Sequence, residues 1–367
     1  MTYWIENADS ALLLPTLPTA SVDALVTDPP AGIGFMGKEW DDFRRARNPA
    51  DAGRDSVHGR LSRSGPEYGR RDRENFITWL ASILRECLRV MKPGAYGWVW
   101  AIPRTSHWTA MACEDAGFTV RDVMTHVQSQ GFPKSRSCLK PAAENWILIK
   151  APGELRELRI DECRIAFAVN DTDTWAKGEP GVRQGGFVDI GAEKGSSVPN
   201  GKKHDAGRWP ANFALSHCDD CADTCVEDCP VRLLDEQSGI LKNGGLNSGV
   251  GVSSGYAGAI PQTSNSRYAG DSGGASRFFY VAKASTKERS AGLPDRNSHP
   301  TVKSVALMRH LIRLIAAPGS LILDPFTGSG STAVAALQEG CRFAGIEQDS
   351  QHAETARLRA QHALVHI

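Results

Sequence analysis

The chain has 367 residues, 41% of them hydrophobic, and its 42 basic and 42 acidic residues give a formal net charge of zero. That length allows two domains, or one large domain with a long insertion, and the neutral balance excludes a uniformly basic surface for nucleic acid. No run approaches the ~20 apolar residues that span a bilayer, and residues 1–10 show no basic leader before an apolar core, so we expect a cytoplasmic protein with no membrane partner.

The first 150 residues alternate predicted strands and helices. A strand over 22–27 ends at Asp28-Pro29-Pro30-Ala31, and the next helix, over 76–90, has an apolar stripe at helical spacing. Further strands, with one more helix at 106–116, are predicted at 95–101, 118–127 and 146–149. This alternation favours a three-layer α/β sheet.

Residues 41–73 interrupt that pattern with nine arginines set among Gly, Asp and Ser. A solvated loop and an arm that closes on phosphates are both consistent with this composition, because Arg-rich loops commonly order only on nucleic acid. We therefore expect a mobile Arg-rich loop here.

Periodicity is lost over residues 151–276, which include a Gly/Ser/Asn-rich run and four clustered cysteines, Cys218, Cys221, Cys225 and Cys229. In a cytoplasmic chain such cysteines are thiols or metal ligands rather than disulfides. Four thiols could complete a tetrahedral zinc site, although the spacing is tighter than that of two-knuckle zinc ribbons. The alternative is a short segment without any metal.

The α/β pattern resumes at 277–367. A strand at 321–323 is followed by the Gly-rich run 324–332 and a helix, and the next strand ends at Glu347. A strand, Gly-rich turn and helix bring backbone N–H groups against a bound cofactor. The acid after the next strand can accept hydrogen bonds from ribose hydroxyls. Dehydrogenases share this layout, but they do not need Asp324-Pro325-Phe326 before the glycines.

These motifs, in this order, resemble the β-class of amino-group DNA methyltransferases. In that class a target-recognition region lies between the catalytic motif and the cofactor motif. The resemblance implies a Rossmann-like three-layer methyltransferase sheet with the core in two parts, 1–150 and 277–367, and the irregular target-recognition region inserted at 151–276. It also implies S-adenosylmethionine as cofactor and double-stranded DNA as partner, and it allows a homodimer. A cytoplasmic modification enzyme of a bacterial cell or a phage-infected host, in a restriction–modification system, is the expected setting.

The resemblance assigns roles to individual residues. The catalytic motif is Asp28, Pro29 and Pro30. The expected cofactor-binding residues are Asp9, His299, Pro300, Thr301, Lys303, Asp324, Phe326, Gly328, Gly330, Ser331 and Glu347. Among these, Lys303 is expected near the carboxylate of the methionine part, and Glu347 at the ribose.

The chemistry of an exocyclic amine fits this motif. The lone pair of the amine is delocalised into the base, so the nitrogen becomes nucleophilic only when both of its hydrogens are accepted, here by Asp28 and the Pro29 carbonyl. Proline suits this place because it fixes φ and removes a competing N–H donor. No cysteine nucleophile is required, and the Pro-Cys dipeptide of carbon-5 methylation is absent. The Asp before Pro-Pro favours adenine N6, with cytosine N4 as the alternative.

One residue departs from the pattern. The fourth position of the catalytic motif is usually an aromatic that stacks on the flipped base, and here it is Ala31. Phe35 and Trp40 are the nearest aromatic candidates to replace it. Otherwise the pocket works with weaker stacking, at a loss of ~1–3 kcal/mol, or the protein is a DNA-binding protein with weakened catalysis. A methyltransferase for protein or small molecules is a further alternative, which the Arg-rich loop disfavours.

Overall fold

The structure is a computed structural model. It describes residues 2–33, 41, 70–128, 139–166, 207–218, 220, 221, 224–243, 251–253, 260–262, 271–282, 286–295, 297, 299 and 302–366.

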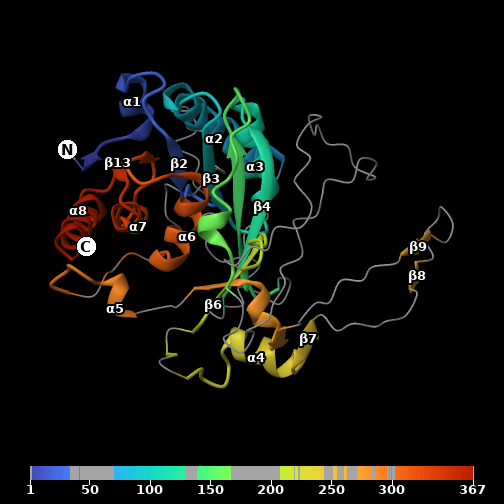
Figure 1. Ribbon diagram of the computed structural model, residues 1–367. Coiled ribbons are helices and arrows are strands. Elements are labelled where there is room, and N and C mark those ends of the chain that lie inside the picture. Colours follow the sequence, from blue (N-terminus) through green and yellow to red (C-terminus); the bar gives the residue numbers. More distant parts are fainter. Residues whose placement is uncertain are drawn as a thin grey trace, which may run out of the picture.

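Nine strands form one mixed sheet at the centre of the molecule (Figure 1). From one edge to the other they are β1 (Tyr3–Asn7), β13 (Arg342–Glu347), β12 (Leu321–Asp324), β2 (Ala24–Thr27), β3 (Tyr96–Ala101), β5 (Ala143–Lys150), β4 (Thr119–Val127), β6 (Phe213–Ser216) and β11 (Tyr280–Ala282). Strand β5 is antiparallel to both of its neighbours, and the other pairs are parallel. Parallel strands are covered on both faces, which explains why β2 and β3 are apolar and buried along their whole length.

Helices cover both faces of this sheet. One group comprises α1 (Ser10–Leu13), the 3-10 helix η1 (Leu14–Thr16), α2 (Arg70–Val90) and α3 (Ser106–Asp115), and the other comprises α6 (Val305–Ile315), α7 (Ser331–Gln338) and α8 (Ser350–Val365). Successive strand residues point to opposite faces. Leu25 and Val99 accordingly share a core with α2 and α3, while Val26 and Trp98 share a core with α6, α7 and α8. The predicted three-layer α/β fold is confirmed.

Where the structure describes the region predicted as an irregular insertion, it contains regular elements. It contributes β6 to the main sheet, and it contains the 3-10 helix η6 (Asp161–Cys163) and α4 (Pro230–Ser238). Two short antiparallel pairs follow, β7 (Leu241–Asn243) with β10 (Asp271–Gly273), and β8 (Gly251–Ser253) with β9 (Ile260–Gln262). The 3-10 helix η7 (Ala275–Phe278) then leads to β11, and α5 (Thr286–Arg289) follows it. Strand β6 escaped prediction because four residues between polar neighbours carry almost no periodicity.

The predicted Arg-rich loop falls mostly outside the described residues. Its last four residues, 70–73, belong to the first turn of α2, which therefore begins six residues before the predicted start. None of the helices in the described part of the chain combines the length and the apolar character needed to cross a bilayer.

Candidate active site

The two motifs singled out in the sequence meet at one edge of the sheet. Asp28 follows β2, and the Gly-rich turn follows the adjacent parallel strand β12. The carboxyl ends of neighbouring parallel strands lie side by side, which is where ligands bind in such sheets. A hydrogen bond joins the two strand ends directly, because the Thr27 hydroxyl donates to Asp324 Oδ1 at 2.7 Å.

Asp324 stabilises the start of the Gly-rich turn by hydrogen bonds. The same Oδ1 accepts a hydrogen bond from the Phe326 N–H at 3.1 Å, and the Asp324 side chain is buried. Burial raises the pKa of the Asp324 carboxyl to about 7, although the hydroxyls of Thr332 and Thr27 oppose the rise. Asp324 was predicted to bind the cofactor. Its described contacts hold the Gly-rich turn together, and its contact with the cofactor stays a prediction.

Two glycines give the turn its path. Gly328 and Gly330 have φ of 53° and 81°, a region that side chains disfavour. A Cβ on Gly330 would lie 2.8 Å from the Ala356 Cα of α8, so only glycine fits between the turn and that helix. Ser331 then begins α7. The turn therefore presents backbone at a helix N-terminus, as cofactor binding requires.

Acidic side chains stand around this turn. Glu347, at the end of β13, accepts a hydrogen bond from the Gly328 N–H at 2.8 Å, and its other oxygen accepts one from the Asp349 N–H at 2.8 Å. Asp9 follows β1, which pairs with β13, and caps α1 by accepting from the Ala11 N–H at 2.8 Å. The structure thus brings both predicted acids to the edge that carries the turn.

The remaining predicted cofactor residues border the turn where the structure describes them. The His299 ring faces Gly328, since a Cβ there would lie 3.1 Å from His299 Nε2. Burial, with His352 nearby, lowers the pKa of His299 to about 3, so its imidazole is neutral. The Phe326 ring packs at 5.7 Å from the Trp79 ring of α2. Pro300 and Thr301 lie outside the described residues, as do Phe35 and Trp40.

Lys303 lies against the catalytic carboxylate. Its ammonium donates to Asp28 Oδ2 at 2.7 Å and stands 4.0 Å from the centroid of the Trp100 ring. Only 9% of the Lys303 side chain and 21% of the Asp28 side chain are exposed. The predicted contact of Lys303 with the cofactor stays a prediction, and the described contact is with the catalytic motif.

Burial and charge act in opposite directions on this pair. Burial raises the pKa of Asp28, and the Lys303 ammonium partly offsets that rise. Burial lowers the pKa of Lys303, but Asp28 and Glu144 outweigh it, so the net direction is upward and the ammonium is retained. Burial opposes ionisation of Glu144 as well, yet Lys303 and His126 lower its pKa to about 2. The site therefore holds one buried cation between two carboxylates.

Several residues that organise the site gave little signal in the sequence. Glu144 sits on β5 opposite His126, whose Nδ1 lies 3.5 Å from the Glu144 carboxylate. Arg359 of α8 is buried and donates to the Ser329 carbonyl at 2.6 Å, which fixes the Gly-rich turn from below. Asp41 accepts hydrogen bonds from the backbone N–H groups of residues 32 and 33, just after the catalytic motif. Of these residues, only Glu144 could have been suspected from the sequence, because it is an acid in a largely apolar strand.

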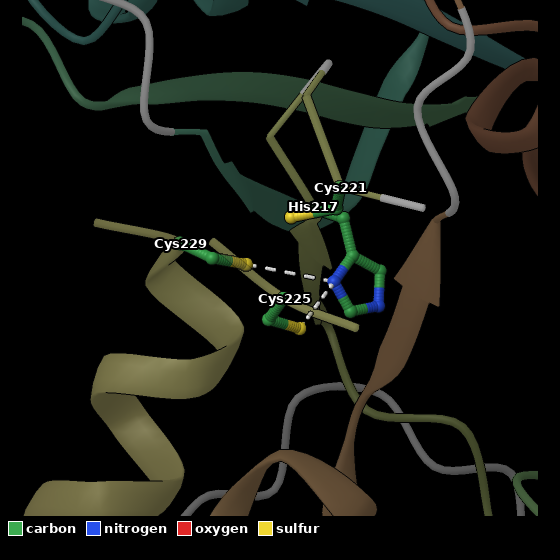
Figure 2. Close-up of side chains that lie close together, drawn as sticks. All are labelled: His217, Cys221, Cys225 and Cys229. Carbon is green, nitrogen blue, oxygen red and sulfur yellow. Dashed lines mark hydrogen bonds between the residues drawn. The ribbon is translucent and has the colours of Figure 1, made fainter. Parts of the chain in front are cut away.

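The structure also gathers thiols away from this site. Three of the predicted metal ligands, Cys221, Cys225 and Cys229, lie together with His217, and the four potential ligand atoms are within 4.8 Å of one another (Figure 2). This group differs from the predicted ligand set in one member, because it contains His217 and not the neighbouring Cys218. The Cys218 thiol instead lies 3.8 Å from the Asp228 carbonyl oxygen.

Comparisons with known proteins find similar sequences and similar structures. The model of the N6/N4 DNA methylase family matches residues 22–358. The chain is 23% identical to the Type II methyltransferase M.HindIII of Haemophilus influenzae over 361 residues, covering 94% of this chain and 91% of that protein. The structure of the cytosine-N4-specific PvuII DNA methyltransferase aligns with a TM-score of 0.51 at 12% identity, over 98% of this chain and 86% of that chain. The structure of the M1.HpyAVI–SAM complex aligns with a TM-score of 0.44 at 15% identity, over 97% of this chain and 99% of that chain.

The match of the family model across most of the chain shows that the protein belongs to the N6/N4 family of amino-group DNA methyltransferases. It is an enzyme, and its cofactor is S-adenosylmethionine. The likeness to the PvuII enzyme supports the fold alone.

Proposed function

We propose that the protein transfers a methyl group from S-adenosylmethionine to the N6 amine of an adenine flipped out of duplex DNA. The observation that carries this proposal is the placement of Asp28-Pro29-Pro30 beside the Gly-rich turn, at the carboxyl ends of two adjacent strands. The Asp before Pro-Pro supports adenine, through the resemblance to the enzymes that share this motif.

The residues around the turn fit the cofactor. The turn supplies backbone at the start of α7, and a glycine with positive φ is required there by the close approach of α8. Glu347 and Asp9 supply carboxylates that suit hydroxyl and amine groups. When bound, S-adenosylmethionine supplies an electrophilic methyl group on a sulfonium.

The protein's own contribution is to prepare the amine. In the described part of the chain, Lys303 contacts Oδ2 of Asp28, and we assign the other oxygen, Oδ1, to one amino hydrogen of the base. The Pro29 carbonyl accepts the second hydrogen. Both interactions draw the nitrogen toward a tetrahedral geometry, which frees its lone pair to attack the methyl carbon. Asp28 accepts the proton that the amine loses. Because burial raises the pKa of Asp28, this carboxylate is a stronger base than an exposed one.

Extrusion of the base costs a few kcal/mol, which stacking and hydrogen bonds must offset. The Ala31 carbonyl accepts a hydrogen bond from the Thr105 hydroxyl at 2.9 Å, so the backbone of the motif is held in place even without the usual aromatic. We assign the stacking role to Trp40 or Phe35.

The test is to incubate the protein with isotopically labelled S-adenosylmethionine and mixed-sequence duplex DNA, digest the DNA to nucleosides and analyse them by mass spectrometry. Labelled N6-methyladenine is the expected product. N4-methylcytosine would retain the mechanism and refute the base. Absence of any methylated nucleoside, with cofactor binding demonstrated by calorimetry, would instead favour a DNA-binding protein with weakened catalysis or another substrate.

A further inference from the structure

Four side chains of residues 217–229 lie close together just beyond the end of β6. His217 follows that strand directly, Cys221 and Cys225 lie in the loop after it, and Cys229 stands at the residue before α4 (Figure 2). His217 Nδ1 is 3.3 Å from Cys225 Sγ and 3.5 Å from Cys229 Sγ. All four potential ligand atoms lie within 4.8 Å of one another.

These separations are close to those of a zinc centre. With Zn–S bonds of about 2.3 Å and Zn–N bonds of about 2.0–2.1 Å, tetrahedral geometry places a sulfur and a nitrogen ~3.5 Å apart, and two sulfurs ~3.8 Å apart. The two nitrogen–sulfur distances already have this length. The widest pair would have to contract by about 1 Å relative to its limit of 4.8 Å.

We propose that His217, Cys221, Cys225 and Cys229 bind one zinc ion in a structural Cys3His site. Thiolates and an imidazole are soft to borderline ligands, which select zinc over magnesium or calcium. Four protein ligands fill the tetrahedral shell, so no position remains open for a water or a substrate, as is typical of structural zinc.

The local packing indicates that a metal would stabilise this part of the fold. The small hydrophobic core at this place has five buried members, Leu215, Cys218, Cys221, Cys229 and Val231, and three of the five are cysteines. Such a core supplies little apolar area, and units of this kind are commonly completed by a disulfide or a metal. The described cysteines are free thiols, which leaves the metal as the available cross-link.

The proposed zinc would join β6 to a larger part of the insertion. Cys229 is the N-cap residue of α4, and its side chain makes no capping hydrogen bond there. At the other end of α4, Asp235 accepts hydrogen bonds from the Ser276 N–H at 2.8 Å and the Ser276 hydroxyl at 2.7 Å. Through these contacts the metal would fix α4 and η7 to the main sheet, near its β6–β11 edge, whereas the cofactor turn lies near the β1 edge (Figure 1).

Cys218 provides a matched control, because it neighbours His217 and is buried in this core as Cys221 is. If it is a packing residue, its replacement leaves the metal in place. If it were a ligand instead of His217, the centre would contain four thiolates. The two ligand sets differ in how many sulfurs surround the metal, which spectroscopy can count.

The experiment uses the full-length protein, purified without chelators, with zinc measured by plasma mass spectrometry. We expect about one zinc per chain in the wild type and in Cys218→Ser, and a loss of most of it in Cys221→Ser and Cys225→Ser. Cofactor binding, measured by calorimetry on every variant, shows whether the sheet is folded.

Replacement of zinc by Co²⁺ gives a spectroscopic measure of how many sulfurs surround the metal. We expect visible bands of a tetrahedral centre with thiolate charge transfer for three sulfurs, and a gain toward four-sulfur intensity in His217→Cys. Much less than one zinc per chain in wild type that binds cofactor, with the cysteines reactive as thiols or joined as disulfides, would refute the proposal. So would zinc lost in Cys218→Ser and kept in His217→Ala.

Discussion

Replacement of Lys303 by methionine tests how the active site controls its catalytic carboxylate. The change keeps most of the side-chain volume and removes the ammonium that contacts Asp28 Oδ2 at 2.7 Å. In the variant, burial still raises the pKa of Asp28, but the cation that offsets this rise is gone. Because only the ionised carboxylate accepts an amino hydrogen, the variant should lose activity on the acidic side of its pH profile and recover it as the pH is raised.

The size of the effect follows from the burial of the pair. Removing one partner of a fully buried ion pair costs about 3–5 kcal/mol. Since 21% of the Asp28 side chain is exposed, water compensates part of the loss. We therefore expect about 2 kcal/mol, after discounting for that solvation. At 1.36 kcal/mol per factor of ten, the acidic limb of the kcat/KM profile should move upward by about 1.5 pH units, which is a fall of about 30-fold at any pH on that limb.

The assay is kcat/KM for DNA methylation as a function of pH, which reports groups of the free enzyme. The acidic limb of the profile should move to higher pH in Lys303→Met. Lys92→Met is the matched control, because Lys92 forms the corresponding pair with Asp23 at the other end of the same strand, at 2.5 Å. The control profile should keep the wild-type limb.

The result that would refute this reasoning is an unchanged acidic limb in Lys303→Met. If the variant also bound S-adenosylmethionine more weakly, Lys303 would act on the cofactor, as the sequence resemblance predicts. Unchanged cofactor affinity with a moved limb would assign its role to Asp28.

Three further predictions test the motifs themselves. Asp28→Ala should abolish methyl transfer and leave the affinity for S-adenosylmethionine within about twofold, and appreciable methylation by this variant would overturn the mechanism. Gly330→Ala should lower the melting temperature and weaken cofactor binding much more than Gly319→Ala, because both residues have positive φ but only the first would place a Cβ against α8; equal losses would show that φ strain alone matters. Trp40→Ala should raise the KM for duplex DNA more than the Kd for the cofactor, by up to ~1–3 kcal/mol of lost stacking, and an unchanged rate would remove Trp40 as the base-stacking residue.

The fold class and the location of the two motifs could be predicted because both are written in local patterns. The apolar runs before Asp28 and before Asp324 define strands, and the glycines after Asp324 define a turn with positive φ, whatever surrounds them. The helices predicted at 76–90, at 106–116 and after the Gly-rich run correspond to α2, α3 and α7, with ends that differ by a few residues. Strand β6 was missed because a four-residue strand depends on its neighbours β4 and β11 rather than on its own periodicity.

The sequence by itself determined the order of strands, turns and helices, the carboxylate and prolines at one strand end, and the glycines at another. Only the tertiary structure decided that Lys303 pairs with Asp28 across 275 positions of chain, that Arg359 holds Ser329, and that His217 rather than Cys218 joins the thiol cluster. The physical reason is that backbone conformation responds mainly to nearby residues. The partner of a buried charge or thiol is set instead by which side chains the packed sheet and helices bring within about 3–4 Å of it.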